Sequence, residues 1–189
     1  VLVNLHLDFE TRSAVDLKKT GVYPYAQDAT TDVWCAAFAV GEEPVHLWHP
    51  DLDDRDLKHA LHHSETVIAH NAAFERVISR YLMTRRYGWP DIAIERWRCT
   101  MAQALAMSLP AGLGDLAKAL QVDAKKDEAG ARLMLQMAKP RAKEACPACH
   151  GVREILHEVA NADGGDLAQE WRDCEMCAGR GTRLTWWNT

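Results

Sequence analysis

Two carboxylates stand two residues apart in the first apolar segment of the chain. Over residues 5–10, LHLDFE, apolar and polar residues alternate. A period of two is typical of a β-strand and places Asp8 and Glu10 on the same face. Neighbouring carboxylates repel each other, and a bound Mg²⁺ or Mn²⁺ with oxygen ligands relieves that repulsion. We therefore predict a divalent-cation site at Asp8 and Glu10, although an ordinary strand that ends in a polar turn shows the same pattern.

A third acid follows a second apolar strand. Residues 66–71, TVIAHN, run directly into residues 72–82, whose apolar positions recur with the period of an amphipathic helix. Asn71 is the expected N-cap of this helix, and Glu75 falls in its first turn, directed back toward the end of the strand. Glu75 is therefore expected at the same edge of the sheet as the first two acids. Stabilisation of the helix dipole is the alternative role for this side chain.

These two segments resemble the first two motifs of the DEDD family of 3′–5′ exonucleases, which have a ribonuclease H-like fold. Residues 8–10, DFE, match the D-x-E motif of the family. Residues 71–75, NAAFE, match the second motif, with Glu75 where most members carry aspartate. The chain is also similar to the exonuclease segment of phage-type family A DNA polymerases, and this resemblance covers roughly residues 1–141. The segments that carry it are residues 8–13, 21–26, 70–75, 87–90, 96–100 and 132–141.

The resemblance implies a metal-dependent 3′–5′ exonuclease that hydrolyses DNA phosphodiesters, the proofreading-like part of a phage-type replication protein. Asp8, Glu10 and Glu75 would be catalytic and would hold two Mg²⁺ or Mn²⁺ ions, which can clamp the attacking and leaving oxygens. The implied partner is the 3′ end of single-stranded DNA, with a polymerase domain in the parent chain. The positions expected to bind substrate are Thr11, Arg12, His70, Asn71 and Phe74.

The family takes a fourth carboxylate from a third motif, Tyr-x-x-x-Asp or His-x-x-x-x-Asp, on a later helix. Asp123 and Asp127 have no tyrosine or histidine at the required distance before them. We therefore expect an enzyme whose sequence stops before the third motif, so that this fragment could lack the fourth carboxylate and be inactive. The alternative is a catalytically inactive module on the same fold that binds nucleic acid or protein through its C-terminal cysteines. An exoribonuclease on the same scaffold is a third hypothesis.

The C-terminal part contains two C-x-x-C pairs, each followed closely by glycine. Such pairs can present four thiolates to one tetrahedral Zn²⁺, which then has a structural role. The interval between the pairs is long for a zinc ribbon, and a short helix is expected at residues 153–160. Disulfides are the alternative, but they are less favoured in a chain without a secretory signal. The expected zinc ligands are Cys146, Cys149, Cys174 and Cys177.

The order of the remaining patterns indicates the fold class. A hairpin of strands at residues 32–40 and 45–48 precedes alternating helices and strands, which predicts an α/β fold with a mixed sheet flanked by helices. We expect a ribonuclease H-like sheet with a small C-terminal zinc-ribbon-like insertion. The expected domains are an exonuclease-like domain at 1–141, a zinc module at 142–184 and the start of a continuation at 185–189. Helices are expected at residues 51–63, 100–108, 112–120 and 128–139, with a short strand at 96–99.

The composition is that of a globular domain. The chain has 189 residues, 48% of them hydrophobic, and a formal net charge of −5, which gives no support to a basic nucleic-acid coat protein. No apolar run is long enough to span a membrane, and the N-terminal residues lack the apolar core of a signal peptide. We therefore expect no membrane partner and a cytoplasmic location in a bacterial or phage-infected host cell. Trp34, Trp48, Trp89 and Trp97 are expected in packing contacts.

Overall fold

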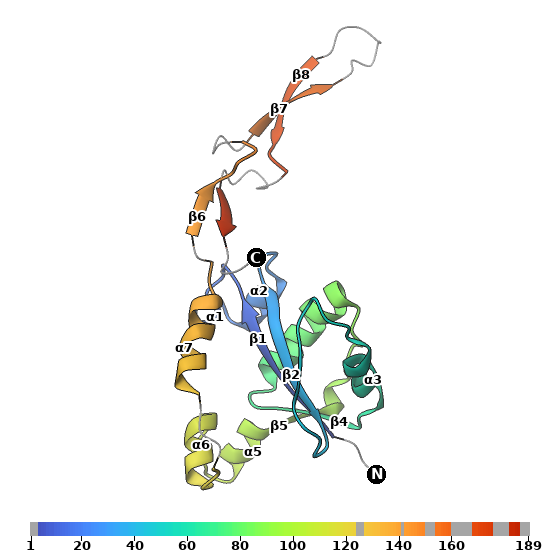
Figure 1. Cartoon of the computed structure of the whole chain (residues 1–189), viewed down its shortest axis with the longest axis vertical. Coiled ribbons are helices and arrows are strands. Elements are labelled where there is room, and N and C mark those ends of the chain that lie inside the picture. The colour runs from blue at the N-terminus through green and yellow to red at the C-terminus, as the bar shows by residue number, and fades with distance from the viewer. Residues whose placement is uncertain are drawn as a thin grey trace. The chain divides into compact units, whose positions relative to one another are not determined.

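The chain divides into two compact units, residues 1–138 and 139–189. The computed structural model describes residues 4–123, 127–140, 142–149, 154–159, 168–175 and 182–185. Figure 1 shows the elements of both units. No described helix is long and apolar enough to cross a membrane.

The first unit is built on a five-stranded mixed sheet with the order β3-β2-β1-β4-β5. The central strand β1 pairs antiparallel with β2 and parallel with β4, and β5 extends the sheet in parallel beyond β4. The hairpin of β2 and β3 is the one expected from the sequence. This order is consistent with a ribonuclease H-like fold. The strands are Asn4–Arg12 (β1), Asp32–Val40 (β2), His46–Trp48 (β3), Thr66–Ala69 (β4) and Trp97–Cys99 (β5).

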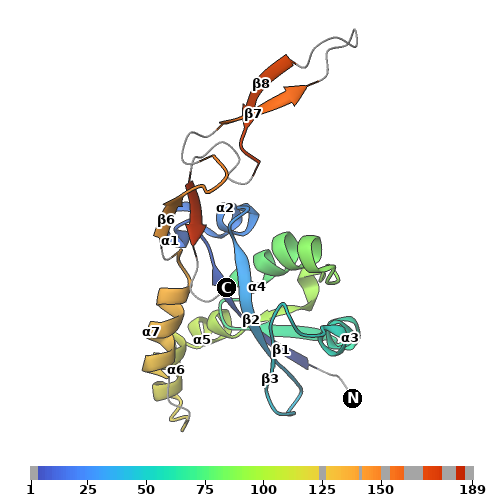
Figure 2. The ribbon, with the colours of Figure 1, turned by 45° about the horizontal axis from the view of Figure 1, so that its top comes forward.

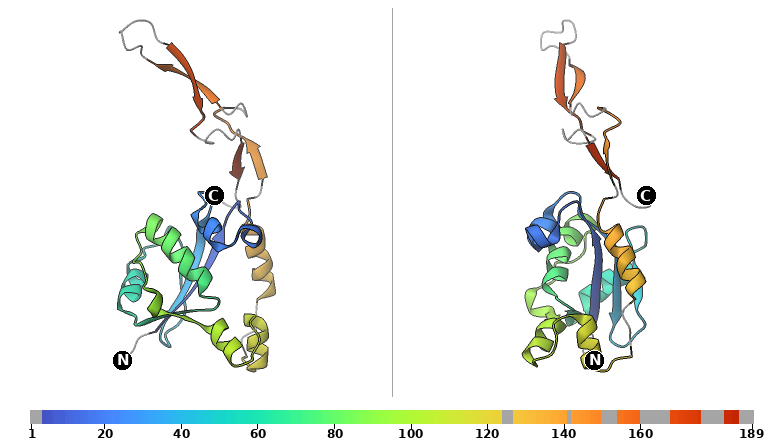
Figure 3. Two further views of the ribbon diagram at one scale, coloured as in Figure 1. Left: turned by 180° about the vertical axis from the view of Figure 1, so that it is seen from behind. Right: turned by 90° about the vertical axis from the view of Figure 1, so that its left-hand side faces the viewer.

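Helices cover both sides of the sheet. Helices α3 and α4 lie on one side of strands β1 and β2, and α5, α6 and α7 lie on the other (Figures 1 and 2). Figure 3 shows α4 and α7 on opposite sides of the strands seen from their edge. The helices are Leu17–Thr20 (α1), Val22–Gln27 (α2), Arg55–His63 (α3), Ala73–Ile78 (α4), Ser79–Tyr87 (η1), Ile94–Arg96 (η2), Thr100–Ala106 (α5), Leu113–Ala119 (α6) and Glu128–Met137 (α7).

The long helix after β4 changes its hydrogen-bond pattern halfway. Its first part, α4, is α-helical, and its second part, η1, continues with the wider turns of a π-helix. Within η1 the Thr84 hydroxyl donates to the Ser79 carbonyl, 3.1 Å away and five residues earlier. Gly88 ends the helix with φ of 65°, a left-handed conformation that glycine adopts without steric cost. π-Type turns are rare and occur frequently at functional sites.

Three aromatic rings form the centre of the core beneath β1. Trp89 is only 2% exposed and packs against Phe9 and Trp48, with ring centroids 5.8 and 5.1 Å apart. Its indole N–H donates to the Asp54 carboxylate at 3.0 Å, so the polar atom of this buried ring is also satisfied. The expected packing role of this tryptophan is therefore confirmed.

Replacing Trp89 with alanine should lower the free energy of unfolding by about 3–5 kcal/mol, because the large cavity left behind cannot collapse fully. Chemical denaturation monitored by circular dichroism measures this change. Leu47→Ala is the control, since Leu47 is 62% exposed and its truncation should cost no more than about 0.5 kcal/mol. Equal losses in the two variants would contradict the assigned core.

The described residues of the second unit form two antiparallel strand pairs. Strand β6 (Ala142–Ala145) pairs with β9 (Thr182–Thr185), and β7 (Glu154–Val159) pairs with β8 (Ala168–Asp173). The helix expected at residues 153–160 was therefore wrong, because the described part of that segment is the strand β7. Its short apolar pattern does not distinguish a helix from a strand, and pairing with β8, distant in sequence, decides the outcome.

Candidate active site

Strand β1 divides its side chains between the two faces of the sheet as the alternation predicted. Leu5, Leu7 and Phe9 are at most 4% exposed and belong to the core, whereas Asp8 and Glu10 are exposed on the other face. A β-bulge follows directly, between Glu10 and Thr11. Bulges redirect side chains and are common beside active sites. The central strand thus presents two exposed acids on the face of the sheet opposite the core.

Helix α4 brings Glu75 to this acid pair. The side chain is only 3% exposed, and its Oε2 atom has no hydrogen-bond partner among the described residues. Burial raises the pKa of Glu75 to about 8, and the negative charges of Asp8 and Glu10 add to this shift. The structure therefore brings the three predicted acids together, with Glu75 the most buried of them. An unpaired buried carboxylate beside two others is costly without a cation.

His70 contributes positive potential at the same place. Desolvation by the surrounding protein raises the pKa of the Asp8 carboxyl, because it disfavours the charged form. The nearby imidazole of His70 acts in the opposite direction and lowers this pKa. His70 Nε2 lies 2.8 Å from the Ala111 carbonyl, and Nδ1 lies 3.0 Å from the Thr100 hydroxyl. Because a carbonyl can only accept, Nε2 carries a proton. The two contacts fix the ring beside Asp8.

Cys35 is a neighbour of the acids that the sequence did not indicate. It lies opposite Glu10 in the antiparallel register of β1 and β2 and is half-buried. Burial raises the pKa of the Cys35 thiol, and the charges of Glu10 and Asp8 raise it further. The sequence could have indicated Cys35 only if the register between β1 and β2 were known, and the bulge shifts that register by one residue. Cys35 is thus a neutral thiol beside the acid cluster at ordinary pH.

The residues next to β1's acids are engaged in structural contacts. The Thr11 hydroxyl shares a buried 2.8 Å hydrogen bond with the Tyr25 hydroxyl. Arg12 stacks on Trp34, with its guanidinium carbon 4.5 Å from the ring centroid, and pairs with Asp32 at 3.6 Å. Substrate contacts by Thr11 and Arg12 therefore stay predictions.

Asn71 is not the N-cap of α4, and its predicted contact with substrate stays a prediction. Its φ is 62°, a left-handed conformation that asparagine tolerates better than most residues, and Ala72 is the N-cap of α4. The prediction of Asn71 as N-cap was therefore wrong. Its carbonyl accepts from the Phe74 backbone N–H at 2.9 Å, which turns the chain from β4 into α4 and so delivers Glu75. Phe74 is half-buried, with its ring centroid 6.3 Å from that of Tyr25.

One segment has the Tyr-x-x-x-Asp spacing, at Tyr87 and Asp91, but it lies elsewhere. The Tyr87 hydroxyl donates to Asp32 at 2.8 Å. Asp91 lines a cavity together with Trp97, which is paired with Val67 and so shares the core face of the sheet. The acids of β1 are on the opposite face. This spacing therefore does not supply the fourth carboxylate beside Asp8.

A cavity of about 370 Å³ opens beside Asp8 on the acid face. Its walls are largely apolar, with Ala37 and Ile68 from the acid face of the sheet and Leu113 from α6, and His70 forms part of its polar side. Apolar walls with a few polar groups are typical of sites that hold a flat organic group. The cavity therefore places room for such a group directly next to the acids.

The donor set fits hard divalent cations. Asp8, Glu10 and Glu75 offer carboxylate oxygens, which Mg²⁺ and Mn²⁺ prefer. The Oε2 atom of Glu75 is buried and has no hydrogen-bond partner among the described residues, which is the observation that most favours a bound cation at this position. The residues present therefore fit the metal ions that the sequence motifs imply.

A separate cluster of cysteines lies in the second unit. Cys146 follows β6, Cys174 follows β8, and the sulfurs of these residues and Cys149 all lie within 4.8 Å of one another. The Cys146 and Cys174 sulfurs are 3.7 Å apart, too far for a disulfide but close to the ~3.8 Å edge of a tetrahedral Zn–S₄ site. Backbone N–H groups of Cys149 and Ala148 lower the pKa of the Cys146 thiol to about 7. The three thiols could therefore hold zinc.

Cys177, the fourth predicted ligand, lies outside the described residues. All five described cysteines, which include the half-buried Cys99, are free thiols. Zinc as the occupant of the cluster remains a prediction.

Cys149→Ser should lower the zinc content of the purified protein and loosen the second unit, while the acid site keeps its metal affinity. Elemental analysis and zinc release to a colorimetric chelator measure the change. Cys35→Ser is the matched control, because Cys35 lies in the other unit and should leave zinc content unchanged. Reduced wild-type protein that contains no zinc would contradict the assignment.

Comparison with known proteins shows a similarity to a phage protein. No family model matches the chain. The DNA polymerase of Bacillus phage SP02 is 34% identical to it over 141 residues, a match that covers 72% of this chain and 21% of the polymerase. The chain therefore spans about a fifth of the length of this relative.

Proposed function

We propose that the first unit is a metal-dependent 3′–5′ exonuclease that removes nucleotides from the end of a DNA strand. The observation that carries this proposal is the buried, unpartnered carboxylate of Glu75 against Asp8 and Glu10. The similarity to a phage DNA polymerase supports DNA as the substrate and a polymerase as the setting of the activity.

The proposed roles follow from the positions of the side chains. Asp8 and Glu10 are exposed on the central strand and would hold two Mg²⁺ or Mn²⁺ ions, with Glu75 as the inner ligand. When bound, the ions would activate water and stabilise charge on the phosphodiester. His70, fixed by Thr100 and Ala111, would orient the strand end beside Asp8. The 370 Å³ cavity with Ile68 and Leu113 would hold the terminal base or sugar.

Cleavage of labelled DNA tests the proposal. A single strand labelled at its 5′ end should give a ladder of products shortened one nucleotide at a time in Mn²⁺. The same strand labelled at its 3′ end should release the label as a mononucleotide from the start of the reaction. Internal cuts, or shortening from the 5′ end, would contradict a 3′–5′ exonuclease.

The cysteine cluster favours a second candidate, a non-catalytic module that binds nucleic acid or protein. Its sulfur geometry suits a structural ion, which could hold the two strand pairs of the second unit as a binding surface. Under this candidate, binding of a single strand would survive loss of Asp8 and Glu10 but fail after Cys149→Ser. The opposite pattern would favour the exonuclease.

A further inference from the structure

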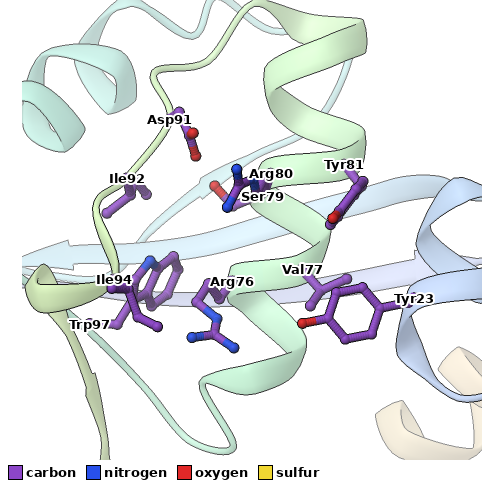
Figure 4. Close-up of a pocket in the computed structure, with 10 residues that line it drawn as sticks. All are labelled: Tyr23, Arg76, Val77, Ser79, Arg80, Tyr81, Asp91, Ile92, Ile94 and Trp97. Carbon is purple, nitrogen blue, oxygen red and sulfur yellow. The ribbon is translucent and has the colours of Figure 1, made fainter.

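A second cavity, of about 210 Å³, lies between the helix α4–η1 and the segment that leads into β5. Figure 4 shows Arg76, Ser79 and Arg80 entering it from the helix, with Trp97 on the facing strand. Since a water molecule accounts for about 30 Å³ of the liquid, the cavity has room for several waters or for one compact polar group.

This cavity is separate from the acid site. Trp97 is in register with Val67, which is in register with Leu5, so the three side chains share the core face of the sheet. Asp8 and Glu10 belong to the opposite face. A group bound beside Trp97 therefore does not contact the acids.

Two arginines give the cavity positive charge. Arg76 and Arg80 are four residues apart, so they lie on the same side of the helix. Neither forms an ion pair within the part of the chain that the structure describes. Asp91 is the acid among the lining residues, and it leaves an excess of one positive charge. This local excess contrasts with the net charge of −5 for the whole chain.

Two buried polar atoms at the cavity have no hydrogen-bond partner. Ser79 is 2% exposed and Trp97 is 8% exposed, yet Ser79 Oγ and Trp97 Nε1 are both unsatisfied among the described residues. The indole N–H can only donate, so its partner must be an acceptor. A buried donor without an acceptor is destabilising, because it has lost its hydrogen bonds to water, and an occupant of the cavity that accepts from it would restore one.

We propose that this cavity binds a phosphate group, either of a free nucleotide or of a nucleic-acid strand. Two guanidinium groups, an indole N–H and a hydroxyl are all able to donate, and a phosphate offers several acceptor oxygens and the complementary charge. A metal cation does not fit, because the arginines would repel it and the indole could not ligate it. Asp91 limits the excess charge, so the affinity should be moderate.

The test follows the indole signals of the full chain by two-dimensional ¹H–¹⁵N NMR in buffer without divalent cations. The Trp97 indole signal is assigned from the spectrum of Trp97→Phe. Inorganic phosphate and thymidine monophosphate should shift this signal saturably, whereas thymidine should not. Arg76→Gln and Arg80→Gln should each weaken phosphate binding about 10-fold or more, through loss of a charge-assisted hydrogen bond.

Arg55→Gln is the matched control, because Arg55 is an exposed arginine on α3 that does not line the cavity. It should leave phosphate binding unchanged, and thermal melts should show that all the arginine variants stay folded. No saturable shift with phosphate would overturn the proposal and indicate a water-filled cavity. If Arg55→Gln weakened phosphate binding equally, the proposal would also be overturned, since the effect would then come from the overall charge of the protein and not from the cavity.

A third arm identifies the source of the phosphate. A thymidine octanucleotide that shifts the Trp97 signal at lower concentration than the monophosphate would identify a strand as the ligand. A monophosphate that binds while the octanucleotide leaves the signal unchanged would identify a free nucleotide. Because no cleavage is measured and no divalent cation is present, failure of the exonuclease proposal would leave this result intact.

Discussion

Glu75→Gln should make the protein more stable than wild type at pH 8 when no Mg²⁺ or Mn²⁺ is present. Burial raises the pKa of Glu75 from 4.5 to about 8, so the folded state holds this proton more tightly than the unfolded state does. The associated stability is fully present below pH 4.5 and is lost as the pH rises to about 8. A shift of this size corresponds to at most about 5 kcal/mol. The glutamine amide of Glu75→Gln stays neutral over this pH range, so the variant does not lose this stability.

Urea denaturation between pH 4 and pH 9 in buffer without divalent cations measures this difference. Wild type should lose stability across the window, and millimolar Mg²⁺ should restore part of it at pH 8. Glu65→Gln is the matched control, because Glu65 is exposed and this variant should keep the slope of wild type. Parallel pH profiles for wild type and Glu75→Gln would show that the Glu75 carboxyl is not desolvated as described.

Asp8→Ala should reduce Mn²⁺-dependent shortening of a DNA strand by about 1000-fold or more. Loss of the ligand on the central strand would remove several kcal/mol of transition-state stabilisation. Asp8 is exposed, so the fold should be nearly unchanged. Rates of product formation at saturating Mn²⁺, with circular dichroism as the check on folding, measure the effect.

Asp51→Ala is the control for this experiment, because the Asp51 side chain is 94% exposed and lies outside both cavities. It should cleave like wild type. Cleavage by Asp8→Ala at the wild-type rate would remove Asp8 from the site. Cleavage that is equally reduced in Asp51→Ala would indicate a general effect of surface charge on DNA binding.

The sequence was sufficient where a local pattern determines the structure. Alternation over residues 5–10 predicted which face of β1 carries Asp8 and Glu10, because side-chain direction in a strand has a fixed period. The hairpin of β2 and β3 and the helix with Glu75 followed from equally local signals. The approach of Glu75 to the two acids could be expected only because β1 and β4 were placed in the same sheet.

The sequence did not predict features that depend on pairing between segments distant in the chain or on an unusual backbone conformation. Residues 154–159 became a strand because β8 pairs with them. Asn71 adopts a left-handed turn, which side-chain type alone does not separate from an N-cap. Helices α1 and α2 were not expected, since Gly21 and Pro24 made that stretch resemble an irregular connection. The spacing of Tyr87 and Asp91 matches the third exonuclease motif, but Asp91 lies at the cavity on the core face of the sheet, opposite the acids of β1.

Titration of zinc-loaded protein with Mn²⁺, followed by electron paramagnetic resonance, tests most directly whether Asp8, Glu10 and Glu75 together hold divalent cations. Wild type should remove Mn²⁺ from the free pool saturably, up to two ions per chain. Asp8→Ala and Glu75→Gln should each lose most of this binding, and Asp51→Ala should retain it. Mn²⁺ binding that is absent in wild type, or unchanged in Asp8→Ala and Glu75→Gln, would contradict a metal site at the three acids.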